Sequence, residues 1–185
     1  NPRRSGAFYR FVIEGSRRSH HVRCILPGTA HQNMTQPTLK TSAPAAETTS
    51  FSTLSLAPPL AQAIQVLGFS QMTPVQEHAL PSLLAGRDVI ARARTGSGKT
   101  VAFGLGLLTR VDVDVARVQV LVLCPTRELA DQVTQELRRL ARFIANLRVV
   151  TLCGGVPVRT QRPSLQNTSY VIVGTSGRIL DHLQR

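Results

Sequence analysis

A glycine-containing turn that ends in Lys99 and Thr100 carries the clearest chemistry in this chain. The turn follows a short apolar segment at 88–91 and precedes an apolar stretch of helical length at 101–109. Glycines allow a tight turn whose backbone N–H groups face phosphate oxygens, and the helix N-terminus adds about half a positive charge there. The pattern predicts a phosphate-binding loop, formed by Ala93, Arg94, Thr95, Gly96, Ser97, Gly98, Lys99 and Thr100.

Lys99 and Thr100 have separate roles in this prediction. The Lys99 ammonium would reach the β- and γ-phosphates of a nucleoside triphosphate, and the Thr100 hydroxyl would complete the ligand shell of Mg²⁺. Ala93 stands where the general pattern has a glycine. A turn that binds no ligand is the alternative, but the strand before the loop and the helix after it both favour the phosphate site.

Length and charge restrict the class of protein. A chain of 185 residues suits one domain, and a hydrophobic fraction of 42% is enough for a core. The formal net charge is +12, and residues 34–185 alone keep an excess of +7, which favours a polyanionic partner such as nucleic acid. The three cysteines show no disulfide or metal spacing, and no apolar stretch approaches the ~20 residues of a membrane span, so we expect a cytoplasmic protein.

The N-terminal third differs in composition from the rest. Residues 1–33 carry six arginines and one acidic residue, and we interpret them as a basic extension that is non-native or disordered. An organelle transit peptide is the alternative. Residues 34–59 are rich in Thr, Ser, Ala and Pro, which is typical of a linker, and Phe51 is the one aromatic residue in it. We expect the folded domain to occupy residues 60–185.

From residue 60 onward, helical and strand patterns alternate. We expect helices at 60–67, 74–84, 101–109, 127–146, between 152 and 170, and from 175 onward, and strands at 88–91, 118–123, 148–152 and 170–173. Thr73-Pro74-Val75-Gln76 has the residue types of a capping box, and Gly104 and Gly106 suggest close packing of their helix against the sheet. The alternation predicts an α/β fold with a parallel sheet covered on both faces.

Three loops that follow predicted strands share a chemical character. In open parallel sheets, ligands bind beyond the carboxyl ends of the strands. Small and hydroxyl residues, glycine backbone and arginine at such helix starts can hold the phosphates of a nucleic-acid strand. Each loop alone is an ordinary helix cap, but together they predict a track of phosphate contacts, formed by Pro125, Thr126 and Arg127, by Gly154 and Gly155, and by Thr175, Gly177 and Arg178.

Residues 51–185 resemble the first RecA-like domain of the DEAD-box ATP-dependent RNA helicases, and most of all the bacterial DbpA type. The closer likeness to the DbpA type lies in the segments 103–108, 123–133 and 151–155. The phosphate loop of this family begins with alanine, so Ala93 matches the family pattern. Residues 68–76 resemble the family's Q motif. The resemblance implies that Gln76 reads the adenine edge and that Phe51 and Phe69 contribute to the adenine site, which favours ATP over GTP.

The same resemblance assigns the three loops to the RNA backbone. Ser176 replaces the proline that is usual in the family's Thr-Pro-Gly-Arg motif, while Thr175 and Arg178 are retained. The resemblance implies an ATP-dependent RNA helicase that uses ATP and Mg²⁺, unwinds RNA locally, acts on ribosomal RNA during ribosome assembly, and is monomeric at full length.

The family's acidic Asp-Glu-Ala-Asp tetrad is absent from these 185 residues. We therefore expect a RecA-like domain that is incomplete at its C-terminus, with Lys99 and Thr100 as its only residues of the catalytic machinery. We also expect the isolated chain to be inactive and unstable. Three alternatives stay open: a non-catalytic ATP- and RNA-binding fragment, an inactive pseudogene product, and a different P-loop ATPase that lacks the Gln76 adenine contact.

Overall fold

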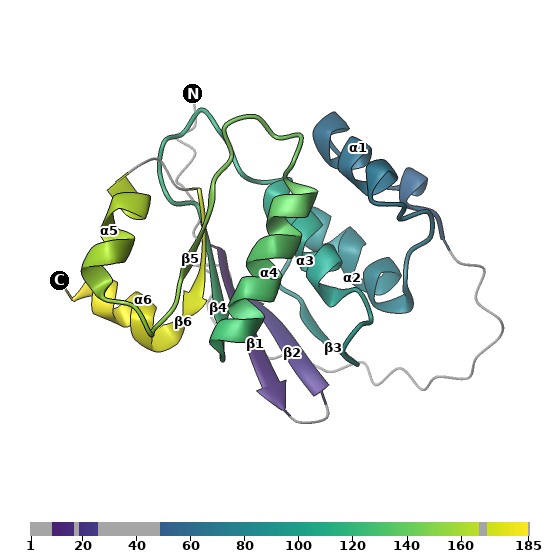
Figure 1. Cartoon of the computed structure of the whole chain (residues 1–185). Coiled ribbons are helices and arrows are strands. Elements are labelled where there is room, and N and C mark those ends of the chain that lie inside the picture. Colours follow the sequence, from purple (N-terminus) through teal and green to yellow (C-terminus); the bar gives the residue numbers. More distant parts are fainter. Residues whose placement is uncertain (1–8, 17–18, 26–48, 167–169, 185) are drawn as a thin grey trace.

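Helices lie on both sides of a six-stranded mixed sheet in the computed structural model, which describes residues 9–16, 19–25, 49–166 and 170–184 (Figure 1). The elements in chain order are β1 (Tyr9–Ser16), β2 (Ser19–Ile25), a 3₁₀ turn (Phe51–Thr53), α1 (Pro58–Val66), α2 (Pro74–Leu84), β3 (Ile90–Ala93), α3 (Lys99–Leu108), β4 (Val120–Cys124), α4 (Arg127–Leu140), β5 (Val149–Leu152), α5 (Val158–Gln166), β6 (Val171–Thr175) and α6 (Ser176–Leu183). No helix in these ranges is long and apolar enough to span a bilayer.

The strand order β3-β2-β1-β4-β6-β5 places the candidate loops on one edge of the sheet. β4, β6 and β5 are mutually parallel, β1 is parallel to β4, and β2 is antiparallel to both β1 and β3. β3 therefore runs in the same direction as β4. The carboxyl ends of β3, β4, β6 and β5 meet at the same edge, as the alternating pattern predicted.

The N-terminal hairpin is a difference from the sequence-based expectation. Residues 9–16 and 19–25, expected to have no fold, form β1 and β2 and lie between β3 and β4. Valine, isoleucine and aromatic residues favour strands, and Val12, Ile13 and Val22 lie in these segments. The sequence did not predict these strands because arginine dominates the local composition and the strands that pair with them lie about 70 to 110 residues further along the chain. Residues 26–48, which include the first 15 residues of the predicted linker at 34–59, lie outside the described ranges.

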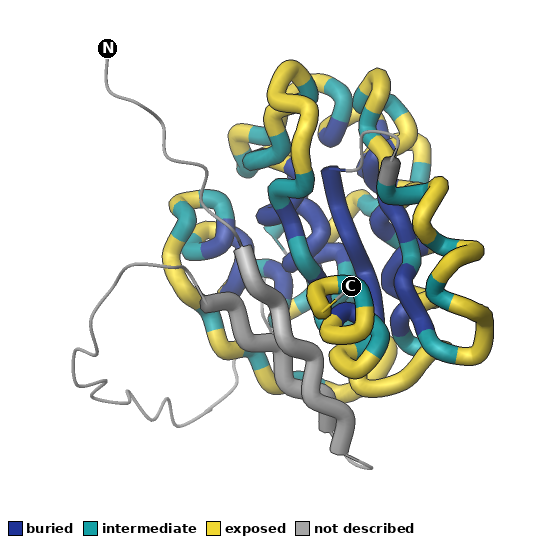
Figure 2. Tube along the Cα trace, turned by 90° about the vertical axis from the view of Figure 1, so that its left-hand side faces the viewer, coloured by how far each residue is buried: buried dark blue, intermediate teal, exposed yellow. Residues whose placement is uncertain are grey.

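The two faces of the sheet carry separate apolar clusters. In β4, Val120 and Val122 belong to the large cluster that includes residues of α1, α2, α3 and α4. Leu121 and Leu123 point the other way and pack against a smaller cluster that includes Ile179 of α6. Period-two alternation of this kind is what a strand between two helical layers requires. In Figure 2, most of β4, β5 and β6 is drawn as buried, whereas α5 and α6 are largely exposed or of intermediate exposure.

Helix starts agree with the sequence better than helix ends. α2 begins at Pro74 after Thr73, and α6 begins at Ser176 after Thr175, as expected. α4 ends at Leu140, six residues before the predicted end, and Asn146 has a left-handed φ of 62°. The folded part also begins earlier than residue 60, because the chain at Phe51–Thr53 forms a 3₁₀ turn and α1 starts at Pro58.

The two glycines of α3 approach neighbouring helices rather than the sheet. A Cβ on Gly104 would lie 2.8 Å from Cδ1 of Leu140 in α4, and a Cβ on Gly106 would lie 2.8 Å from Cβ of Leu83 in α2. α3 is therefore wedged between α2 and α4. The prediction of close packing was right, but the predicted partner, the sheet, was wrong.

Candidate nucleotide site and nucleic-acid interface

The predicted phosphate loop connects the end of β3 to the start of α3. Gly96 and Gly98 have φ angles of 78° and 85°, the left-handed region that glycine adopts without strain. Gly98 is the residue before the first turn of α3, so the free N–H groups of that turn face the loop. The turn, the helix start and the two left-handed glycines therefore have the geometry that the sequence predicts for a phosphate site.

Lys99 lies inside the curve of this loop. Its ammonium donates to the carbonyl oxygens of Ala93, at 2.7 Å, and Arg94, and it lies 3.3 Å from the Ser97 hydroxyl. Partial burial lowers the pKa of Lys99 below its ordinary value. The cation is thus fixed at the centre of the loop, where an anionic ligand would gain most from it.

A pocket of about 350 Å³ opens beside Lys99 and Thr100. Its walls come from the phosphate loop and α3 on one side and from α4 on the other, where Leu129, Gln132 and Glu136 line it. Thr100 could supply one hydroxyl oxygen to Mg²⁺, which usually takes few protein ligands and completes its shell with phosphates and water. Among the described residues, no group of three or more His, Cys, Asp or Glu side chains gathers around a common point.

Gln76 connects the start of α2 to the phosphate loop. Its side chain is buried, its Oε1 accepts from the Thr73 backbone N–H at 2.8 Å, and its Nε2 donates to the Gly98 carbonyl at 3.1 Å. The Thr73 hydroxyl also donates to the Ser97 carbonyl at 2.7 Å. The residue predicted to read adenine therefore also holds the loop that faces the phosphates, so its contact with the base stays a prediction.

Phe51 and Phe69 meet although 17 residues separate them in the sequence. Their ring centroids are 6.3 Å apart with planes tilted by 37°. Ser50 pairs with Gln71 in an isolated bridge, which brings the segment around Phe51 against the Q-motif loop. Both rings line a pocket of about 520 Å³. Phe51 is only 5% exposed, so Phe69 offers the more accessible ring for stacking.

The three predicted nucleic-acid loops lie side by side. Because β6 pairs with both β4 and β5, the loops after β4, β6 and β5 are neighbours at the sheet edge. Cys124 at the end of β4 is opposite Thr175, and Leu152 at the end of β5 is opposite Gly174. The structure therefore brings together Pro125, Thr126 and Arg127, Gly154 and Gly155, and Thr175, Gly177 and Arg178.

Arg127 and the glycine pair are in close contact. A Cβ on Gly155 would lie 2.2 Å from Nη1 of Arg127, and one on Gly154 would lie 3.1 Å from its Nη2. Gly155 has a left-handed φ of 94°. The guanidinium of Arg127 thus lies against glycine backbone, so a positive charge and loop backbone without side chains lie together, which is a combination suited to phosphate binding.

The start of α4 is capped by Thr126, whose Oγ1 accepts from the Leu129 N–H at 3.3 Å. The pKa of the exposed Glu128 carboxyl is lowered. The carboxylate accepts hydrogen bonds from the Glu128 backbone N–H and from the Thr126 hydroxyl, and the charge of Arg127 adds a smaller effect. Glu128 is therefore a stable anion at the helix start, where it partly offsets the charge of Arg127.

Cys124 is the last residue of β4, and Cys153 follows the last residue of β5. Both are buried free thiols. Burial raises the pKa of Cys124 to about 12, with a smaller contribution from Cys153, and burial also raises the pKa of Cys153. Protonated, buried thiols behave as small apolar side chains. These positions agree with a structural role for both cysteines.

Comparison with known proteins decides the family. The DEAD/DEAH box helicase family model matches residues 73–185, which include the phosphate loop and all three edge loops. The chain belongs to the DEAD/DEAH box helicase family. The fold agrees with this membership, because β4, β6 and β5 are parallel and a glycine-containing loop connects β3 to the start of α3.

Curated members of the helicase family match over the same region. The chain is 59% identical over 138 residues to the ATP-dependent RNA helicase DbpA of Escherichia coli, a match covering 74% of this chain and 30% of that protein. It is 43% identical over 137 residues to the DEAD-box ATP-dependent RNA helicase CshA of Bacillus cereus, covering 74% of this chain and 26% of that protein. The chain thus spans less than a third of the length of these relatives.

Solved helicase structures have the same fold. A DEAD box protein from Methanococcus jannaschii matches with a TM-score of 0.66 and 34% identity, over 74% of this chain and 37% of that one. Dbp5 of Saccharomyces cerevisiae, solved bound to RNA and ADP BeF3, matches with a TM-score of 0.65 and 36% identity, over 74% of this chain and 34% of that one. The RecA-like fold class predicted from the sequence is confirmed.

Sequence reasoning missed one polar contact network near the edge loops. Gln161 of α5 hydrogen-bonds both to the loop after β5 and to Arg178 of α6. No motif in the sequence marks it, and its partners lie 8 and 17 residues away along the chain. Only the folded arrangement of β5, α5 and α6 brings these groups together.

Proposed function

We propose that this chain is the ATP-binding part of an ATP-dependent RNA helicase and contains one portion of its RNA-binding surface. The observation that carries the proposal is the common sheet edge, where the Lys99 loop and three further loops end parallel strands. ATP is the nucleotide proposed, with Gln76, Phe51 and Phe69 around its base, and Mg²⁺ is the proposed ion, with the Thr100 hydroxyl as one ligand.

Different residues of this chain would bind the nucleotide and the RNA. Lys99 and the N–H groups at the start of α3 would hold the phosphates, and Mg²⁺ would neutralise part of their charge when bound. Arg127, the Thr126 and Thr175 hydroxyls, and the backbone at Gly154, Gly155 and Gly177 would hold an RNA strand. Contacts to phosphates rather than base edges give little sequence preference, so this domain would select RNA by backbone shape.

The full helicase cycle is proposed from the family. ATP would close the protein on one RNA strand, and hydrolysis would release it after local strand separation. Ribosomal RNA is the proposed target because of the similarity to DbpA, and a cytoplasmic monomer is the proposed form. No Asp-Glu-Ala-Asp tetrad and no acidic cluster occur in the described ranges. That observation favours a second candidate function for the isolated chain, namely ATP and RNA binding without efficient hydrolysis.

Nucleotide binding can be tested directly on the 185-residue chain with mant-ATP fluorescence. Lys99→Ala should weaken binding roughly 10- to 150-fold, since hydrogen bonds to charged groups contribute about 1.5–3 kcal/mol. Arg117→Ala, an exposed site between α3 and β4, is the matched control and should leave binding unchanged. ATP should displace mant-ATP better than GTP does. Equal displacement by the two nucleotides, or an unchanged affinity for Lys99→Ala, would refute the proposed ATP site.

RNA binding needs a separate measurement. Fluorescence anisotropy with a labelled ten-nucleotide oligouridylate should show an affinity that falls as salt rises, because phosphate contacts release counterions. Arg127→Ala should weaken this binding and reduce the salt slope by about one. A chain that binds mant-ATP but not the oligouridylate would refute the RNA surface and leave the nucleotide site standing.

A further inference from the structure

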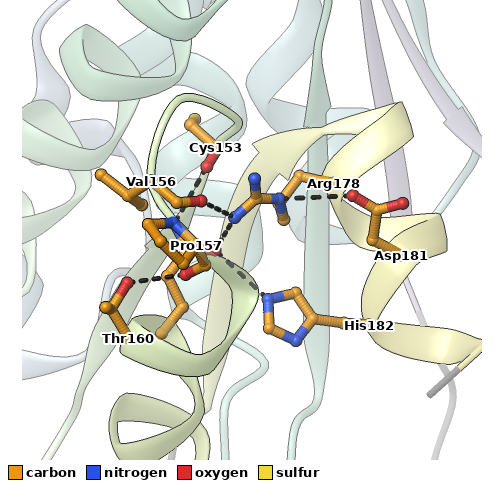
Figure 3. A network of polar contacts seen from close by, with 8 residues as sticks. Cys153, Val156, Pro157, Thr160, Arg178, Asp181 and His182 are labelled. Carbon is orange, nitrogen blue, oxygen red and sulfur yellow. Dashed lines mark hydrogen bonds and ion pairs between the residues drawn. The ribbon is translucent and has the colours of Figure 1, made fainter.

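A polar network connects the glycine loop after β5 to the start of α6. Gln161 of α5 lies at its centre: its Nε2 donates to the Cys153 carbonyl at 2.9 Å, and its Oε1 accepts from Nη1 of Arg178 at 2.9 Å. The Nε2 of His182 lies 3.2 Å from the same oxygen. Figure 3 shows Arg178 and His182 extending from α6 toward the loop that carries Cys153 and Val156.

Arg178 faces this loop rather than open solvent. Its side chain is 9% exposed, its Nη1 donates to the Val156 carbonyl at 2.7 Å, and its Nε lies 3.6 Å from the carboxylate of Asp181. The bonds to Cys153 and Val156 flank Gly154 and Gly155 on both sides. The two ends of the glycine pair are therefore held by side chains from two different helices.

A glycine pair needs such support because it has no stiffness of its own. Glycine loses more backbone freedom on ordering than any other residue, so an unsupported loop would bind a phosphate only at a large entropic cost. Hydrogen bonds that fix the loop before binding reduce that cost. They also keep the loop in register with Thr175 and Gly177, which lie just ahead of Arg178.

We propose that Gln161 is a positioning residue for RNA binding, which orders the Gly154–Gly155 backbone and aligns it with the start of α6. Arg178 acts in the same network, through the loop carbonyl at Val156. This inference rests on the proposed function, because it assumes that the glycine loop and the α6 start contact an RNA backbone. It adds a residue outside the edge loops to the RNA-binding machinery.

Two substitutions separate the donor and acceptor functions of the amide. Gln161→Met keeps the length and most of the volume of the side chain but removes both hydrogen-bonding groups. Gln161→Glu keeps an acceptor for Arg178 and His182 but has no donor for the Cys153 carbonyl when ionised. Gln184→Glu introduces the same charge change at an exposed position just after α6, and it is the matched control.

Hydrogen exchange on the 185-residue chain tests the ordering step without RNA. The peptide that covers 153–157 should exchange roughly 2- to 10-fold faster in both Gln161 variants, the range expected for one lost hydrogen bond. Peptides from α3 and the phosphate loop should keep their rates, and so should every peptide of Gln184→Glu. An unchanged rate at 153–157 in both Gln161 variants would overturn the inference, whatever the chain does with RNA.

Binding of the labelled ten-nucleotide oligouridylate tests the consequence. Affinity should fall by roughly the same 2- to 10-fold in Gln161→Met. Mant-ATP affinity and the slope of binding against salt should stay at wild-type values, because no phosphate contact and no charge has been removed. A merely structural role would instead lower mant-ATP binding together with RNA binding, and that outcome would overturn the positioning role.

Two further outcomes distinguish a failure of the positioning role from a failure of the proposed function. If the wild-type chain binds the oligouridylate and both Gln161 variants bind it equally well, the positioning role fails while the proposed function stands. If the wild-type chain binds mant-ATP but no oligouridylate, the RNA part of the proposed function fails, and the role of Gln161 in RNA binding fails with it.

Discussion

Replacing Gln76 by glutamate tests whether its amide holds the phosphate loop. The two side chains have nearly the same shape, so packing is preserved. The introduced carboxyl can still accept from the Thr73 N–H, but when ionised it places a charged oxygen against the Gly98 carbonyl, where the amide donates at 3.1 Å. Gln76 is 3% exposed, and the Thr73 N–H and the Gly98 carbonyl that contact its amide are both uncharged, so the new charge would be buried.

Protonation sets an upper limit on the destabilisation. An ordinary glutamate has a pKa of about 4.3, and keeping the carboxyl neutral at pH 7 costs about 1.36 kcal/mol for each of about 2.7 pH units, or about 3.7 kcal/mol. The neutral carboxyl could donate to the Gly98 carbonyl as the amide does. We therefore expect Gln76→Glu to lower the unfolding free energy by about 2–3.7 kcal/mol at pH 7 and by about 1 kcal/mol at pH 5.

The sign of the pH dependence follows from the raised pKa of the introduced carboxyl. Between the unfolded pKa and the higher folded pKa, the native state binds more protons than the unfolded state, so stability falls as pH rises. Urea unfolding followed by circular dichroism at pH 5 and pH 7 measures both free energies. Gln135→Glu, an exposed position on α4, is the control and should change neither value by more than about 0.5 kcal/mol.

Two results would refute this reasoning. The first is a loss at pH 7 no larger than that of Gln135→Glu, which would mean that the amide donor contributes nothing. The second is a large loss that is the same at pH 5 and pH 7, which would indicate disturbed packing rather than a buried charge. Mant-ATP affinity should fall with stability only at pH 7, since the Gly98 contact lies in the phosphate loop.

Three further predictions address the core. Gly104→Ala should destabilise the chain by about 1–3 kcal/mol in urea unfolding, because its Cβ would overlap α4, whereas Gly177→Ala meets open space and should be neutral or stabilising. Thr134→Val should cost about 1–3 kcal/mol because it leaves the Thr151 hydroxyl without its 2.8 Å partner, and adding Thr151→Val should recover most of that loss; an additive double variant would contradict this. Unfolding free energy should fall between pH 9 and pH 12, because the unfolded Cys124 thiol ionises near 9 and the folded one near 12, and Cys124→Ala should reduce that slope.

The sequence predicted the backbone best where a few neighbouring residues determine it. The glycine turn before α3 and the starts of α2 and α6 were placed correctly because capping residues and left-handed glycines act within a few positions. The predicted end of α4 was wrong because Ile144 continues the apolar period beyond Leu140, where the helix ends. Its side chain still packs against the core, although the backbone there is no longer helical. Periodicity reports which side chains are buried, and it does not report the backbone path that buries them.

Features that depend on contacts distant in the sequence were not predictable from it. The hairpin formed by β1 and β2 takes its place through pairing with β3 and β4, and its arginine-rich composition indicated the opposite. The partners of Gly104 and Gly106 are decided by the crossing of α3 with α2 and α4. In the same way, no motif marks Gln161, because its contacts exist only where the loop after β5, α5 and α6 meet.

The position of α4 connects the two parts of the candidate site. Its first turn holds Arg127 against the glycine loop, while Gln132 and Glu136, one and two turns further on, line the pocket beside Lys99. Arg138 near its end donates to the Val149 carbonyl of β5 at 2.8 Å, which fixes the helix to the strand that leads into the glycine loop. Under the proposed function, a nucleotide in that pocket that shifted α4 would also displace Arg127 relative to an RNA strand at the glycine loop.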